Sequence, residues 1–353
     1  IRDVAPSRGL GDVYKRQAID SETANPFQAY QATRYVDTAI PHIPVTAHGL
    51  KENGYATIAT TNWLPYSWSI NNVAFAEVMH TALSYFQAGR ADAGYKLLKS
   101  SVLDGMYLGD SPGNFGQISF YDAARGECYR DFGDPIGVAS RVLIQGLFGI
   151  LPDALNKQII LRPGFPADWD KASVSTPDIS YRFTRKEDTD TYHITQRFQT
   201  PLHPVLQINA RKEKIRSVKV NDVPATWQSI ESAHGYPLLS IQAEGTSSTT
   251  ITIEWEGAPL HTLAAQEPVI ASNGKLALQI PSGASISQVY DPQSVLAKHT
   301  MGATAFNAQI KGEPGHHTFF VYTHQGEMDW WQPVNIYIEN TRTVSYTHLR
   351  AHE

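Results

Sequence analysis

Cysteine is almost absent from this sequence of 353 residues. The single cysteine, Cys128, excludes an internal disulfide and most zinc sites, which need several cysteines or histidines. Secreted and periplasmic proteins of this length can lack disulfides, so the cysteine count does not decide the compartment. The 13 histidines are scattered without the spacing of a metal site. We therefore expect no catalytic metal and no other cofactor.

Long apolar runs and strong charge are missing too. No window approaches the roughly 18 apolar residues of a membrane-spanning helix. The formal net charge is -5, which disfavours nucleic acid because its binding proteins carry basic patches. The chain also has no Gly-Lys-Ser/Thr phosphate loop and no G-x-S-x-G of a serine hydrolase. A neutral, polyhydroxylated partner remains compatible with these absences.

Both ends differ from the rest of the chain. Segments 1–17 and 345–353 resemble translated sequencing adaptors, and no initiator methionine opens the sequence. We exclude both segments from the reasoning about the fold. The native part is then expected to span about 18–344, as an internal piece of a longer protein.

Helical patterns fill the first part of the chain. Asn25 followed by Pro26 predicts a helix start, because asparagine caps helices and proline suits their first turn. Asn71 or Asn72 is expected to cap a helix that Gly89 ends. Its apolar residues follow helical spacing: Phe75, Met79, Leu83 and Phe86. Further helices are predicted at about 91–104 and from the cap Asp134 through about Phe148, the last apolar on most of its surface and therefore buried.

From Ile159 onward, apolar and polar residues alternate with a period of two, which is typical of strands. Turn clusters separate the strands at the spacing of a β-sandwich. The segment GAPLHTLAAQEP marks a junction to a second set of strands. The predicted domains are a helical part (18–152), a β-sandwich (153–258) and a second, truncated β-domain (259–344).

Three motifs carry a resemblance to known enzymes. They are GLFGILPD within Gln145 to Asp153, the set Arg162, Pro163, Pro166 and Trp169, and Trp68 with Asn71. This order resembles the C-terminal part of bacterial six-hairpin glycoside hydrolases, in particular rhamnosidase-like and trehalase-like members, over about 20–260. The segment GECYRDFG is similar to the Gly-Glu-Tyr segment of trehalases. A domain of unknown function from polysaccharide-degrading gut bacteria is another possible match.

The resemblance implies an α+β multidomain fold, with the last hairpins of an (α/α)6 barrel followed by antiparallel β-sandwich domains. It also implies a periplasmic or secreted protein of carbohydrate metabolism. The remaining hairpins and the general acid would belong to a missing N-terminal segment of the same chain, so the piece alone is expected to be inactive.

Glu127 is the first candidate for catalysis. Glycosidases use a pair of carboxylates, about 6.5–9.5 Å apart when the anomeric configuration inverts. Glu127 lies among aromatic residues before a predicted buried helix, where a shifted pKa and a sugar platform would coincide. A salt bridge to Arg125, Arg130 or Arg141 is the alternative role. Asp122 is the second candidate, because its Tyr-Asp pair resembles the base-bearing segment of trehalases, although Ser119 replaces their glutamate.

Several other side chains are candidates for binding a sugar. Aromatic rings stack on the flat C–H faces of sugars, and amides and carboxylates bind their hydroxyls. These candidates are Trp63, Tyr66, Trp68, Asn71, Tyr121, Tyr129 and Asp131. Trp330 and Trp331 are a further candidate surface in the last β-domain. Packing inside the core or against another domain is the alternative for each aromatic.

The sequence therefore predicts part of a glycoside hydrolase that cleaves a plant or host polysaccharide with inversion, with Glu127 as the general base. Two alternatives stay open. One is a polysaccharide lyase with an α-toroid, for which Tyr121 and Tyr129 are present but no histidine lies in the same loop. The other is a non-catalytic carbohydrate-binding or scaffold module.

Overall fold

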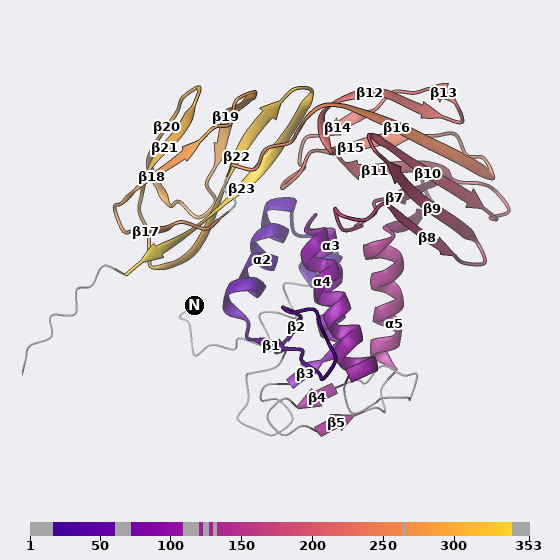
Figure 1. Cartoon of the computed structure of the whole chain (residues 1–353), viewed down its shortest axis with the longest axis horizontal. Coiled ribbons are helices and arrows are strands. Elements are labelled where there is room, and N and C mark those ends of the chain that lie inside the picture. The colour runs from indigo at the N-terminus through magenta and orange to yellow at the C-terminus, as the bar shows by residue number, and fades with distance from the viewer. Residues whose placement is uncertain are drawn as a thin grey trace, which may run out of the picture. The chain divides into compact units, whose positions relative to one another are not determined.

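The computed structural model describes residues 17–60, 72–108, 120–122, 127–129, 133–263 and 266–340, with the backbone alone at 72, 108, 120–122 and 127–129. The chain divides into two compact units, Ile1–Ala258 and Pro259–Glu353 (Figure 1). The first unit holds a group of helices, two small sheets and two larger sheets. The second unit consists of strands in its described part.

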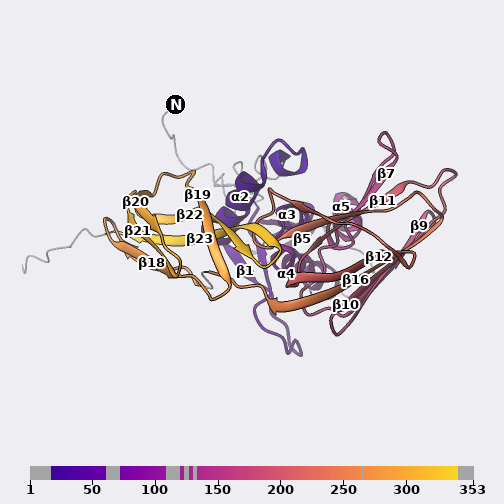
Figure 2. The ribbon, with the colours of Figure 1, turned by 90° about the horizontal axis from the view of Figure 1, so that it is seen from above.

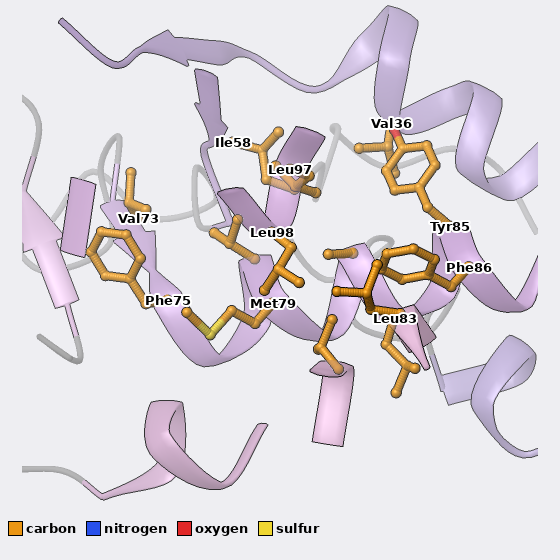
Figure 3. Packing of buried hydrophobic residues seen from close by; sticks show 14 of the residues in the cluster. Val36, Ile58, Val73, Phe75, Met79, Leu83, Tyr85, Phe86, Leu97 and Leu98 are labelled. Carbon is orange, nitrogen blue, oxygen red and sulfur yellow. The ribbon is translucent and has the colours of Figure 1, made fainter. Parts of the chain in front are cut away.

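Helix α3 is the centre of the helical group. The helices are α2 (Pro26–Ala39), α3 (Phe75–Gln87), α4 (Ala91–Val102) and α5 (Asp134–Arg141), with π-helical turns η1 (Leu103–Leu108) and η2 (Val142–Leu147). Helix α3 packs against α2, α4 and α5, and it buries residues on every side. Figure 3 shows its Phe75, Met79 and Leu83 among apolar side chains from α4, including Leu97 and Leu98.

The capping residues were predicted in part. Asn25 forms the expected capping box with Gln28, and α2 begins at Pro26. The prediction that Asn71 or Asn72 caps the next helix is wrong for Asn72, which belongs to a strand, and Asn71 lies outside the described residues. Asp134 is not the cap of α5 either. It is the first helical residue, with Gly133 in the capping position.

The predicted fold class, an α+β protein with part of an (α/α)6 barrel, is wrong. Strand residues outnumber helical residues about two to one, and the described helices do not form a helical barrel. The helices in the described part of the chain are few and short, and the strands form several sheets. Nor is the predicted helix from Asp134 to about Phe148 deeply buried, because Ile136 on α5 and Leu143 on η2 are 56% and 43% exposed.

The glycines of the predicted barrel motif have a packing role. A Cβ atom on Gly146 or Gly164 would lie 2.6 or 2.3 Å from the ring of Phe86, so the two glycines admit this ring between them. Gly149 has a φ of +65°, and its Cβ would lie 1.9 Å from the Arg162 carbonyl oxygen. The glycines of this segment therefore allow close packing between α3 and the segment that leads into the sheets.

Two small sheets accompany the helices. One pairs β1 (His42–Pro44) with β2 (Ala56–Ile58), and the other orders β3 (Asn72–Ala74), β4 (Phe120–Asp122) and β5 (Glu127–Tyr129). All these pairs are antiparallel. Strand β3 leads directly into α3, so the second small sheet is joined to the core of the helical group.

Two larger sheets complete the first unit. The five-stranded sheet has the order β14-β15-β11-β7-β6, and the six-stranded sheet has the order β13-β12-β16-β10-β9-β8. Their strands are β6 (Ile150–Asp153), β7 (Gln158–Leu161), β8 (Lys171–Ser175), β9 (Ile179–Lys186), β10 (Thr189–Gln196), β11 (His203–Asn209), β12 (Lys212–Val220), β13 (Val223–Pro224), β14 (Gln228–Ile230), β15 (Leu238–Gln242) and β16 (Ser248–Pro259). Burial alternates along β9, β10 and β16, which confirms the strands expected from the period of two.

A buried ion network joins three of these strands. Asp190 on β10 is 1% exposed. It accepts hydrogen bonds from Arg185 Nε at 2.9 Å, Arg211 Nη1 at 2.9 Å and the Trp255 indole at 3.1 Å. This arrangement satisfies the carboxylate with two cations and a neutral donor.

The second unit is a sandwich of a four-stranded sheet, β17-β23-β22-β19, and a three-stranded sheet, β18-β21-β20 (Figure 2). Its strands are β17 (Val269–Ala271), β18 (Lys275–Gln279), β19 (Ala284–Tyr290), β20 (Leu296–Met301), β21 (Ala305–Ile310), β22 (Gly315–Gln325) and β23 (Met328–Glu339). The core draws Phe306 from the smaller sheet and Phe319 and Val334 from the larger one. Strand β23 contains Pro333, which lies before the stretch that pairs with β17 and therefore leaves that ladder intact.

Candidate active site

The small sheet β3–β5 brings the two predicted catalytic residues together. Asp122 is the direct cross-strand partner of Glu127, and Asn72 is the partner of Asp122 on the other side. The three residues therefore form one row across the sheet. Directly opposed residues have Cβ atoms roughly 4.5–5.5 Å apart, so the row places an amide and two carboxyl residues at neighbouring positions.

A second row of this sheet contains a residue of the core. Val73 is fully buried in the core of the helical group, and Tyr121 and Cys128 share its row. The Asn72–Asp122–Glu127 row is adjacent to this row in the register. Tyr129 pairs with Phe120 in the next row.

The remaining sequence candidates of this region lie outside the described residues: Trp63, Tyr66, Trp68, Asn71 and Asp131. Of the arginines considered as structural partners of Glu127, Arg125 and Arg130 also lie outside that part of the chain. Arg141 forms its ion pair with Asp20, at 2.6 Å from Nη2 to Oδ1, and donates to Gln145 at 2.7 Å.

Sequence reasoning missed one carboxyl group near this end of the helical group. Asp104 lies on η1, directly after α4. Helices α3 and α4 form an antiparallel hairpin, so η1 lies beside the start of α3 and hence beside the end where β3 joins it (Figure 1). Burial raises the pKa of Asp104 from 3.8 to about 6. Its only signal in the sequence is an acid just beyond an amphipathic helix.

The tryptophan pair of the second unit is divided between two environments. Trp330 is buried at 1% exposure, and Trp331 is half-buried on the opposite side of β23. The ring of Trp331 lies 5.0 Å from that of Tyr322 and 6.5 Å from that of Tyr290, centroid to centroid. Tyr290 is 40% exposed. These three rings form an outer aromatic surface of the four-stranded sheet.

Within the described ranges, no group of three or more histidine, cysteine, aspartate or glutamate residues could hold a metal ion. None of the helices in that part of the chain is long and apolar enough to cross a bilayer.

Comparisons with known proteins give only distant similarity. No protein-family model and no curated protein matches the chain. An α-L-rhamnosidase from Dictyoglumus thermophilum is similar with a TM-score of 0.33 and 12% identity, over 51% of this chain and 21% of the rhamnosidase. This chain thus spans about a fifth of that enzyme. The Ig1-2 module of the Drosophila receptor protein tyrosine phosphatase DLAR is similar with a TM-score of 0.17 and 9% identity, over 43% of this chain and 91% of the module. The periplasmic domain of ScsB from Proteus mirabilis has a TM-score of 0.16 and 8% identity, over 48% of this chain and 99% of that domain.

Proposed function

We propose that this chain is a glycoside hydrolase, or the part of one that carries the reacting carboxylates, and that it acts on a plant or host polysaccharide. The observation that carries the proposal is the pairing of Asp122 with Glu127 across β4 and β5. Glycosidases need two carboxyl groups on either side of the bond that is cleaved. The sequence motifs that resemble those of rhamnosidases and trehalases also indicate hydrolysis of a glycosidic bond.

We propose retention in place of the inversion expected from the sequence. Retaining enzymes hold their carboxyl groups about 5–5.5 Å apart, whereas inverting enzymes leave about 6.5–9.5 Å for a water molecule. The direct pairing of the two residues across β4 and β5 is compatible with the shorter separation. One group, as the carboxylate, would attack the sugar, and the other, as the protonated carboxylic acid, would protonate the leaving oxygen.

The same pairing changes the expectation that the piece alone is inactive. That expectation placed the general acid in the missing part of a barrel, and the described helices do not form a barrel. With Asp122 and Glu127 on neighbouring strands, both carboxyl groups lie in this chain. We therefore expect the chain as it stands to show turnover.

The test is hydrolysis of a panel of para-nitrophenyl glycosides that includes the α-L-rhamnopyranoside. Glu127→Gln and Asp122→Asn should each lower kcat/KM at least about 100-fold, since each removes a reacting carboxyl group. Glu187→Gln, an exposed acid in a turn between β9 and β10, is the matched control and should leave kcat/KM unchanged. Proton NMR of the first-formed sugar should show the anomer of the substrate. Inversion, or turnover that survives both substitutions, would contradict the proposal.

A second candidate function, carbohydrate binding without catalysis, is favoured by the aromatic surface of Tyr290, Tyr322 and Trp331. Small-molecule sites are lined mainly by hydrophobic and aromatic side chains. Here Trp331→Ala should abolish the retardation of the chain in gels that contain soluble polysaccharide. Tyr107→Ala, at a tyrosine that is 66% exposed in the first unit, should not change the retardation. This candidate is supported if the unmodified chain shows no turnover and Glu127→Gln does not change its retardation in the gel.

A further inference from the structure

A cavity of about 490 Å³, lined by both polar and apolar residues, lies between the helical group and the five-stranded sheet of the first unit. Asp20, Gln87 and Arg141 line it from the helical side, and Gln207, Asn209 and Tyr236 line it from the strands and loops of the sheet. Its volume falls within the roughly 300–1,000 Å³ of small-molecule sites. None of its lining residues belongs to the β3–β5 sheet, so it is separate from the carboxylate row.

The charges around this cavity balance. Two acids, Asp20 and Glu22, and two arginines, Arg141 and Arg162, line it. Arg141 binds both carboxylate oxygens of Asp20, at 2.6 and 2.7 Å. Burial would raise the pKa of Asp20, but hydrogen bonds from Arg141 and Gln87 outweigh it and lower that pKa to about 2. The ion pair is therefore fully formed at neutral pH.

The histidine of the cavity does not alter this balance. Burial lowers the pKa of His234, which keeps the imidazole neutral at pH 7. Its Nε2 atom lies 2.8 Å from the Ala88 carbonyl oxygen. With the ionised groups matched in number, the cavity has no excess charge to attract an anion or a cation.

The uncharged polar groups give the cavity its chemical preference. Gln87 donates from Nε2 to Asp20 at 3.0 Å, while its Oε1 atom is buried and accepts no hydrogen bond from the described residues. The buried Oε1 atom has almost no accessible surface, so Gln87 contributes to the cavity by holding Asp20 in its wall. Asn209 adds a further amide, which can donate and accept as sugar hydroxyls do, while the oxygens of Gln145 and Gln207 accept hydrogen bonds from Arg141 and Arg162. Tyr236, 48% exposed, adds an aromatic ring to the lining.

We propose that this cavity binds a small neutral polyhydroxylated ligand of monosaccharide size. Hydroxyl groups match the amides, absence of charge matches the balanced ion pairs, and the aromatic ring suits the C–H face of a sugar ring. The proposal does not depend on catalysis by Glu127, because the two sites share no residue.

The test is a saturation-transfer NMR titration of the whole chain with D-glucose, L-rhamnose and myo-inositol, and with D-glucuronate as the charged comparator. At least one neutral ligand should bind saturably and more tightly than D-glucuronate. Gln87→Leu should weaken that binding about three- to tenfold, because it removes the amide that holds Asp20 in the wall of the cavity. Gln242→Leu, the same change at an exposed position of β15, should not alter the dissociation constant. Trp331→Ala should not alter it either.

Asn209→Leu tests the same cavity from the sheet side if Gln87→Leu does not fold, as judged by circular dichroism. It should also weaken binding of the neutral ligand by about three- to tenfold. Three results would overturn the proposal. They are the absence of saturable binding by all three neutral ligands, tighter binding of D-glucuronate, and unchanged affinity in the folded cavity variants.

Discussion

Asp190 provides a quantitative test of the first unit. Replacing it with alanine leaves Arg185 and Arg211, whose side chains are only 23% and 25% exposed, without their shared carboxylate. It also leaves the Trp255 indole N–H, on a residue that is 1% exposed, without its acceptor. Removing one partner of a buried ion pair costs about 3–5 kcal/mol, and an unpaired buried donor costs roughly 1–3 kcal/mol. Because the arginines keep some contact with water, we expect Asp190→Ala to lower the free energy of unfolding by about 4 kcal/mol.

The matched control is Asp188→Ala, which removes the same charge two residues away. Asp188 is 55% exposed. Its carboxylate forms an ion pair with Lys212 at 2.8 Å, the one ion pair described for this side chain. An exposed pair contributes little to stability, because water and salt screen it. Urea unfolding, followed by tryptophan fluorescence and far-UV circular dichroism, would give both values, with separate transitions fitted if the two units unfold separately. A loss in Asp190→Ala no larger than that of the control would refute the reasoning.

The other predictions concern single buried or ionised groups. Tyr181→Phe should leave the free energy of unfolding unchanged or raise it by about 1 kcal/mol, because the buried hydroxyl has no partner among the described residues; a clear loss in urea unfolding would contradict this. Asp104→Asn should raise the melting temperature at pH 7 but not at pH 4, since a carboxyl with a pKa raised from 3.8 to about 6 destabilises the fold only as it ionises, here by roughly 1–2 kcal/mol after allowance for its partial exposure. Asp20→Asn should do the opposite: the contribution of a carboxylate with a pKa lowered to about 2 is present above about pH 4 and lost toward pH 2, so the variant should melt lower at pH 7 and unchanged at pH 2.

Local patterns in the sequence predicted the elements well. Asn25 and Pro26 start α2 as expected, because capping depends on a few adjacent residues. The alternation along Thr189–Gln196 predicted β10, because a half-buried strand has a period of two. Strand β23 was not predicted, since Pro333 interrupts its pattern. Pro333 lies at a position where β23 pairs with β22 and not with β17.

The partners of these elements could not be predicted from local patterns. An apolar stripe indicates that a helix face is buried but not what covers it, so the stripes around α3 fitted a barrel that the described helices do not form. Gly146 was assigned to a family pattern, yet it makes room for Phe86, which lies 60 residues earlier in the numbering.

The same limit applies to the sites. The candidates Asp122 and Glu127 follow from residue type and aromatic surroundings, and the strand register adds that they are opposed and that Asn72 joins them. The cavity depends on the pair Asp20–Arg141, which are 121 residues apart in the sequence. No local pattern indicates a pairing at that distance.

The proposed catalytic pair is tested most directly by kcat/KM of Glu127→Gln, Asp122→Asn and the double variant, measured on the best para-nitrophenyl glycoside. Residues that act as one catalytic unit are strongly non-additive, so the double variant should be about as slow as the slower single variant. If the double variant instead shows the product of two small independent effects, or if either single variant retains the activity of the unmodified chain, Asp122 and Glu127 do not form the catalytic pair.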